Sequence, residues 1–183
     1  MKEKRKQANS DSPLWFWSLV FLLAGTVFLL ARAAMAAPED YVHIAKRDPA
    51  LILARALVAE AGYSPRKDHP AILHVLRKRT QRKDPVGDAL LALQYCSVFK
   101  DSRQTRHAIK AREAPWEYLQ SAAPEVSQLV RAWVRGHQVK DPCKGKAIHW
   151  GSRDDMHARD IDGRVAVDCG GTANVFLSAW KVN

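Results

Sequence analysis

The stretch Leu53-Ala-Arg-Ala-Leu-Val-Ala-Glu-Ala-Gly62 predicts the last turns of an amphipathic helix that ends at a glycine. The helix should begin at about Pro49 or Ala50. Its apolar residues recur at the i, i+3, i+4, i+7 spacing of a buried helical stripe, and they are Ala54, Leu57, Val58 and Ala61. Glu60 falls on the flank of that stripe, so the stretch predicts a buried helix with one carboxylate in its last turn.

Glu60 lies where a negative charge is unfavourable, because the unpaired carbonyls of a helix C-terminus carry roughly half a negative charge. Apolar neighbours would add a desolvation penalty, and both effects would raise the pKa of the carboxyl group. A glycosidase general acid needs such a raised pKa to hold a proton near neutral pH. The alternative, which the residues alone favour, is a solvated glutamate that pairs with a nearby arginine.

Longer segments around Glu60 resemble a known family. Leu51-Ile-Leu-Ala-Arg-Ala-Leu-Val-Ala-Glu-Ala-Gly62, followed by Pro70-Ala-Ile-Leu-His-Val-Leu-Arg-Lys-Arg79, resembles the opening of the SleB-type cell wall hydrolases. There, a helix that ends in an alanine-glutamate-alanine motif precedes an apolar helix that ends in basic residues. More widely, the chain is similar to lysozyme-like lytic transglycosylases. Three further segments resemble family motifs in order and spacing: Gln94-Tyr-Cys-Ser97, Asp141-Pro-Cys-Lys-Gly-Lys-Ala-Ile-His-Trp150 and Asn174-Val-Phe-Leu177.

The resemblance implies a function for Glu60. It would protonate the oxygen of the β-1,4 bond between N-acetylmuramic acid and N-acetylglucosamine in peptidoglycan, without a metal or organic cofactor. Groove residues that bind the sugars would be Tyr95, His149 and Trp150, with Asn174 beside them. Two departures concern these contacts: Gly62-Tyr-Ser-Pro65 replaces the usual glycine-glutamate, and His149-Trp150 stands where tyrosine or phenylalanine is commoner.

The step after protonation is left open by the sequence. An inverting hydrolase needs a second carboxylate about 6.5–9.5 Å from the first, and a retaining one needs a closer nucleophile. Seven aspartates are available, none in a distinctive motif, and they are Asp84, Asp88, Asp101, Asp154, Asp155, Asp160 and Asp162. A lytic transglycosylase needs one glutamate, which acts as acid and then as base for the sugar's own 6-hydroxyl, and the lack of an obvious partner favours it.

The first 36 residues predict export from the cytoplasm. Basic residues precede the uncharged apolar span 14–31, and Ala34-Met-Ala36 has the small-x-small form of a cleavage site. A span of this length also suffices for a membrane anchor, which needs about 17–25 residues. We expect either an anchored protein or one released after Ala36, with residues 37–48 as a linker and 49–183 as the domain in the cell envelope.

The exported part is basic. Residues 1–36 hold five of the 29 Lys and Arg and two of the 19 Asp and Glu, which leaves 24 against 17 and a formal charge of +7. Such a charge suits the anionic cell wall, and it also suits anionic lipid or DNA. The cluster Arg77-Lys-Arg-Thr-Gln-Arg-Lys83 is of the kind that contacts phosphates, but it also suits a solvated helix end. We expect peptidoglycan as the partner, and no nucleic acid; a binding-only envelope protein stays the alternative to an enzyme.

Three cysteines in an oxidising compartment predict one disulfide and one free thiol. We expect Cys143 to pair with Cys169, because both lie in turn-like contexts and the bond would close a loop around His149 and Trp150. A zinc site built from Cys143, His149, His157 and Cys169 is disfavoured, because the spacings lack the usual close pairs.

The rest of the pattern predicts a mostly α fold of the α+β class, with a small β-rich C-terminal part. A second helix should follow a cap at Asp68, a short third one should run from Pro85 to Leu93, and residues 95–115 should be irregular. The clearest helix should run from Pro124 to Arg135. Short extended runs are expected at 147–150, 164–167 and 174–177.

Overall fold

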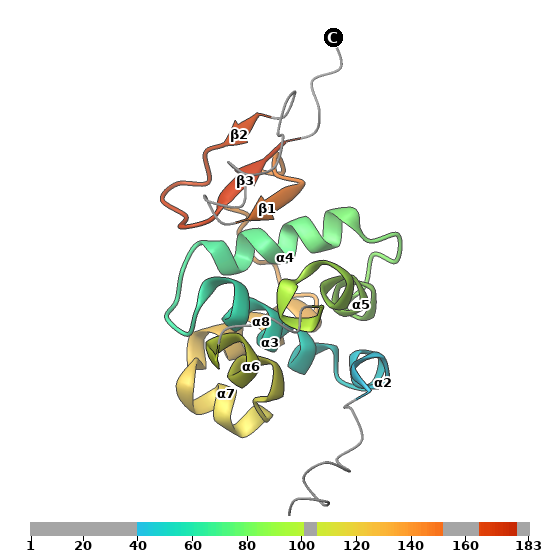
Figure 1. Cartoon of the computed structure of the whole chain (residues 1–183). Coiled ribbons are helices and arrows are strands. Elements are labelled where there is room, and N and C mark those ends of the chain that lie inside the picture. The colour runs from blue at the N-terminus through green and yellow to red at the C-terminus, as the bar shows by residue number, and fades with distance from the viewer. Residues whose placement is uncertain (1–39, 101–105, 152–164, 179–183) are drawn as a thin grey trace, which may run out of the picture. The chain divides into compact units, whose positions relative to one another are not determined.

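The computed structural model describes residues 40–100, 106–151 and 165–178, and the expected export segment with its apolar span 14–31 lies outside them. In the described part, seven α-helices and one short 3-10 helix precede a three-stranded antiparallel sheet (Figure 1). The helices are α2 (Tyr41–Arg47), α3 (Pro49–Ala61), α4 (Asp68–Arg79), α5 (Pro85–Tyr95), η1 (Ser97–Phe99), α6 (Arg106–Glu113), α7 (Trp116–Ala122) and α8 (Pro124–Val134). The strands are β1 (His149–Gly151), β2 (Ala166–Val167) and β3 (Val175–Leu177). The expected mostly α fold with a small β-rich part is confirmed.

Helix α3 is the centre of the helical core. Asp48 caps its N-terminus by accepting a hydrogen bond from the backbone N–H of Leu51, and Pro49 occupies the first turn. Its residues from Ile52 to Val58 are all buried, and it contacts every other described helix. The helix ends at Gly62, whose φ of 88° favours glycine. This confirms the predicted helix and places Glu60 at the end of the central element.

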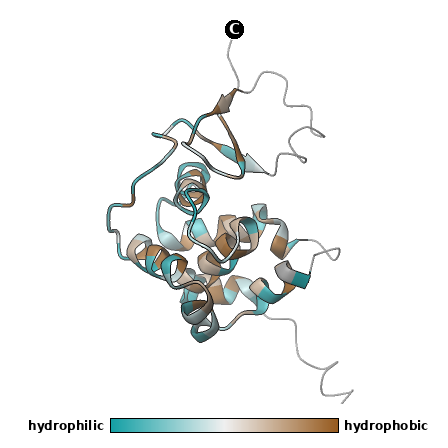
Figure 2. Cartoon of the chain, turned by 90° about the vertical axis from the view of Figure 1, so that its left-hand side faces the viewer, coloured by the Kyte–Doolittle hydropathy of each residue, from teal (hydrophilic) through white to brown (hydrophobic). Residues whose placement is uncertain are grey.

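Helix α2 replaces part of the expected linker. Asp40 caps it by accepting from the N–H of His43, and the helix packs against α3 and α5. Residues 41–47 are therefore part of the packed domain. Figure 2 shows hydrophobic and hydrophilic residues alternating along the helices, as expected of amphipathic helices around a shared core.

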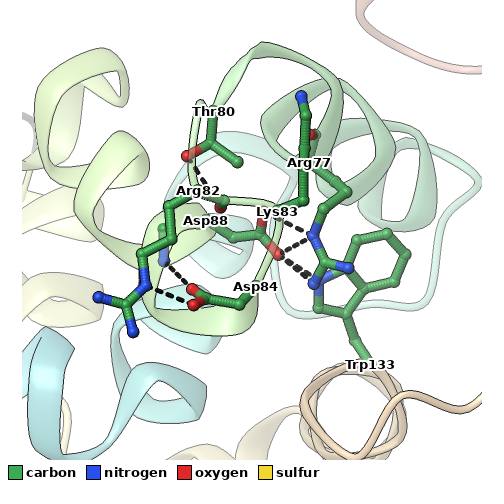
Figure 3. A network of polar contacts seen from close by, with 8 residues as sticks. Arg77, Thr80, Arg82, Lys83, Asp84, Asp88 and Trp133 are labelled. Carbon is green, nitrogen blue, oxygen red and sulfur yellow. Dashed lines mark hydrogen bonds and ion pairs between the residues drawn. The ribbon is translucent and has the colours of Figure 1, made fainter.

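A network of polar contacts joins α4, α5 and α8 (Figure 3). The fully buried carboxylate of Asp88 accepts bonds from Arg77 Nε and Nη2 at 2.7–2.9 Å and from Trp133 Nε1 at 2.7 Å. The Arg77 guanidinium also lies over the Trp133 ring, 4.8 Å from its centroid. Because a buried charge is costly unless it is paired and hydrogen-bonded, this arrangement fixes how the three helices meet.

The sheet has the order β1-β3-β2, with Trp150 opposite Phe176 and Val167 opposite Phe176 on the other side. The expected disulfide between Cys143 and Cys169 is present, and Cys96 is a buried free thiol. In Figure 1, α4 lies between the sheet and the remaining helices, and β1 contacts it. The chain segment with His149 and Trp150 is thereby held against the helical part.

Three expectations for local structure need correction. Asp68 is the first residue of α4 and does not cap it; its carboxylate instead accepts from the N–H groups of Ala173 and Asn174. The segment 95–115 is not irregular throughout, because it contains η1 and α6. Helix α7 was not predicted, since it is short and shows too few turns for a clear periodicity.

Of the helices that the structure describes, none has the length and apolar character needed to cross a membrane.

Candidate active site

The carboxylate of Glu60 is held in one orientation by donors from two distant segments. Its Oε1 accepts from the backbone N–H of Ser97 at 3.0 Å and from the Ser97 hydroxyl at 3.2 Å. Its Oε2 lies 3.3 Å from Trp150 Nε1, which donates. The side chain is half-buried, so it is held by these donors and is still accessible to a ligand.

Asn174 supports the same end of α3 from the sheet side. Its Nδ2 lies 3.4 Å from the backbone oxygen of Glu60, one of the carbonyls that a helix C-terminus leaves without an intrahelical partner. The loop before β3 is fixed by the buried Asp68, which accepts two backbone N–H bonds at 3.0 and 2.7 Å. Asn174 is therefore placed to position Glu60, a role that differs from the expected contact with sugar.

His149 connects the site to α4 and α5. Its Nδ1 lies 3.0 Å from Arg79 Nη1, and because arginine stays protonated, the guanidinium donates and the imidazole nitrogen accepts. The same guanidinium lies 4.0 Å from the ring centroid of Tyr95. Tyr95 is 43% exposed, so part of its side chain is accessible to a ligand.

These contacts bring the predicted site residues together. Trp150 and Asn174 touch Glu60, His149 adjoins Trp150, and Tyr95 is joined to His149 through Arg79. Tyr95 is also two residues from Ser97, which bonds to Glu60. The result is a half-open surface of aromatic and hydrogen-bonding groups around one carboxylate.

Cys96 lies under this surface without taking part in its chemistry. Burial raises the pKa of the Cys96 thiol well above its usual value, and the negative charge of Glu60 raises it further. The thiol therefore stays protonated near neutral pH and is a poor nucleophile.

Two of the seven aspartates considered as a second catalytic carboxylate are occupied elsewhere. Asp88 is fully buried in the network with Arg77 and Trp133. Asp84 caps α5 by accepting from the N–H of Gly87, and it pairs with Arg82. The other five candidates, Asp101, Asp154, Asp155, Asp160 and Asp162, lie outside the described residues.

The zinc site considered from the sequence needs thiolates from Cys143 and Cys169. It is excluded, because these two cysteines are bonded to each other and cannot supply thiolates. His157 lies outside the described residues. Within the described ranges, no group of three or more His, Cys, Asp or Glu side chains is placed to hold a metal ion.

The basic cluster 77–83 is largely used within the fold. Arg77 pairs with Asp88, and Arg82 pairs with Asp84. Lys83 donates to the carbonyls of Arg77 and Lys78 at the end of α4, at 3.0 and 2.7 Å. Such contacts are typical of a helix C-terminus that is stabilised by cations. Of the basic cluster 77–83, Arg79 is the residue that faces the candidate site.

Sequence reasoning missed three residues that build the site. Ser97 was given no role of its own, Arg79 was expected at a solvated helix end, and Asp68 was expected to cap a helix. Comparison of the chain with models of protein families, with curated proteins and with solved structures finds no match. The function is therefore inferred from the residues of the site.

Proposed function

We propose that this protein cleaves the glycan strands of peptidoglycan at the β-1,4 bond between N-acetylmuramic acid and N-acetylglucosamine, with Glu60 as general acid and base. The observation that carries the proposal is the carboxylate of Glu60, held by Ser97 and Trp150 at the end of the central helix. A fixed, half-buried carboxylate in a site that also holds the exposed ring of Tyr95 suits acid catalysis on a sugar. The resemblance to SleB-type hydrolases and lysozyme-like lytic transglycosylases agrees with this chemistry.

The hydrogen bonds also indicate which oxygen carries the proton. Oε1 accepts from both donors of Ser97, and we propose that Oε2 is the oxygen that holds and delivers the proton. As the proton moves to the glycosidic oxygen, the bond from that oxygen to C1 breaks and positive charge develops on the muramic acid ring. The ionised Glu60 then stabilises that charge.

We propose a lytic transglycosylase in preference to a hydrolase. In the second step, Glu60 accepts the proton of the sugar's own 6-hydroxyl while O6 attacks C1, which gives a 1,6-anhydro product and needs no second carboxylate. The engagement of Asp84 and Asp88 elsewhere supports this choice. The cell envelope is the proposed location, with residues 14–31 as an anchor or as part of a cleaved signal.

Mass spectrometry of the products released from purified peptidoglycan tests the proposal. We expect anhydromuropeptides from the unmodified protein and none from Glu60→Gln, which keeps the size of the side chain but removes its proton chemistry. Glu125→Gln, in the exposed first turn of α8, is the matched control and should keep full activity.

The other outcomes separate the alternatives. Reducing ends in place of anhydro ends would indicate a hydrolase. If neither the unmodified protein nor Glu60→Gln releases products but both bind the polymer, the chain is a binding-only envelope protein.

A further inference from the structure

A pocket of about 440 Å³ adjoins the candidate site on the side of α5. Six of its lining residues are Arg79, Arg82, Leu90, Leu91, Gln94 and Tyr95. Arg79 and Tyr95 belong to both the pocket and the candidate site. The described residues that line the pocket include two guanidinium groups and no carboxylate.

The guanidinium groups of Arg79 and Arg82 differ in their partners. Arg82 is exposed and forms an ion pair with Asp84. Arg79 is half-buried, and its contacts in the described part of the chain are with the neutral acceptor of His149 and with the ring face of Tyr95. The guanidinium of Arg79 is thus held on two sides, and none of the carboxylates that the structure describes pairs with it.

The local field around Tyr95 is also positive. Lys100 Nζ lies 5.4 Å from the centroid of the ring, and Arg79 lies over the same ring at 4.0 Å. An arginine with remaining N–H donors in a fixed planar fork is suited to a carboxylate, because two parallel bonds form at once. His149 orients the fork and leaves other N–H groups of Arg79 to a ligand.

We infer that Arg79, held by His149 and Tyr95, binds a carboxylate carried by the glycan strand next to the bond that Glu60 cleaves. This rests on the proposed function, since muramic acid is the sugar that bears the lactyl carboxylate or, when substituted there, a peptide with carboxylates of its own. Arg79 is accordingly a residue that selects anionic, muramic-acid-containing strands over neutral β-1,4 glycans.

Position supports this inference. Glu60 bonds to Trp150 and to Ser97, and Arg79 contacts His149 and Tyr95. Trp150 directly follows His149 in the chain, and Ser97 is two residues from Tyr95. An acidic group on a sugar bound at Glu60 therefore has Arg79 as a nearby cation.

The test is a binding measurement with Glu60→Gln protein, which is expected to bind strands without cutting them. Its affinity for four soluble probes is measured by calorimetry: peptide-bearing glycan fragments, fragments stripped of peptide, and each of these after methyl esterification of its carboxylates. Adding Arg79→Gln should weaken binding of the unesterified probes by about tenfold, because a charge-assisted bidentate contact is lost. Binding of the esterified probes should be the same with and without Arg79→Gln.

Arg135→Gln in the same background is the matched control, because Arg135 is an exposed arginine at the end of α8 that does not line the pocket. It should leave all affinities unchanged. A loss confined to peptide-bearing fragments assigns the carboxylate to the peptide, and a loss confined to stripped fragments assigns it to the free lactyl group. A loss for both kinds of fragment means that Arg79 accepts either carboxylate.

Several results would overturn the inference. These are equal losses for esterified and unesterified probes, a loss with Arg135→Gln as large as with Arg79→Gln, or no binding of any probe by a folded protein. Arg79→Lys keeps the positive charge but lacks the planar fork of arginine. Its affinity for the unesterified probes should lie between the affinities with Arg79 and with Arg79→Gln, which checks that Arg79→Gln has not simply unfolded the site. Because no turnover is measured, a failure of Arg79 to bind carboxylate is distinguishable from a failure of Glu60 to catalyse.

Discussion

At the scale of single residues, the main question is what the indole N–H of Trp150 contributes beyond packing. The ring is buried, but its Nε1 is directed at Oε2 of Glu60, the oxygen that we propose carries the proton. A donor at that point can orient the carboxyl group without touching the substrate. Trp150 is thus a positioning residue as well as part of the core.

Trp150→Phe separates these two roles, because it keeps an aromatic ring and removes the donor. We expect kcat for release of anhydromuropeptides to fall by about tenfold with little change in KM, since the loss affects an aligned acid and not substrate binding. Trp116→Phe, at the start of α7, is the matched control and should be silent. A raised KM with unchanged kcat would instead make Trp150 a sugar-binding residue.

The residues that could be predicted were those inside recognisable motifs. Glu60, Tyr95, His149, Trp150 and Asn174 stood in segments that resemble a family, and the structure brings them together. Ser97 and Arg79 could not be identified, because one hydroxyl or one arginine at a helix end has many equally good structural uses. Ser97 meets Glu60 because η1 packs on α3, and Arg79 meets His149 because β1 packs on α4.

At the scale of elements, the short connection from α3 to α4 is held by one buried histidine. Nδ1 of His69 accepts from the N–H of Arg66 at 3.2 Å, so the proton is on Nε2, which lies 3.0 Å from the Gly62 oxygen and donates to it. The neutral ring thus closes the turn that follows Glu60. Burial lowers the pKa of His69 from its usual value of 6.5, and the neighbouring Gly62 carbonyl and Asp68 offset part of this effect.

This lowered pKa predicts a loss of stability in mild acid. Above about pH 6.5 the ring is neutral in both the folded and the unfolded chain; below it, the unfolded chain takes up a proton more readily than the folded one. Stability should therefore fall as the pH drops from about 6.5 towards the lower pKa of the folded state. The melting temperature of His69→Gln, whose amide can still donate and accept, should fall less between about pH 7 and 5 than that of the unmodified chain. Parallel curves would show that His69 does not contribute.

Helices with strong start signals were predictable, and short ones were not. An Asp-Pro pair marks the start of α3 and of α5, and Pro124 marks the start of α8. In contrast, α2 and α7 have seven residues each, and two turns do not establish a periodicity. These short helices form because they pack on longer ones, which is a property of the folded chain and not of the local sequence.

At the scale of the whole described domain, the candidate site depends on contacts between distant parts of the chain. Glu60 meets Trp150 at a separation of 90 residues, and Arg79 meets His149 at 70. The buried Asp68 reaches Asn174 across 106 residues. Local patterns do not encode such pairs, and only the disulfide was foreseen, because its two cysteines flank the segment that it constrains.

That disulfide makes the site sensitive to reduction. Cys143 and Cys169 are 26 residues apart and enclose β1, which carries His149 and Trp150. Closing a loop of this length stabilises the fold by about 3–4 kcal/mol in the chain-entropy description, so a reductant should lower the melting temperature of the unmodified chain by several degrees. Reduction should also lower activity by more than the fraction of protein that it unfolds, because β1 would hold Trp150 less firmly against Glu60.

Two variants make the measurement specific. Cys143→Ser with Cys169→Ser should melt at the temperature of the reduced protein and show no further response to reductant. Cys96→Ala keeps the disulfide and should respond to reductant as the unmodified chain does, since Cys96 is a free thiol. Amide hydrogen exchange gives the local readout: reduction should speed exchange in residues 149–151 and 175–177 before it affects α3. Uniform acceleration across both the sheet and α3 would mean that the bond stabilises the domain as a whole and has no special role in holding the site.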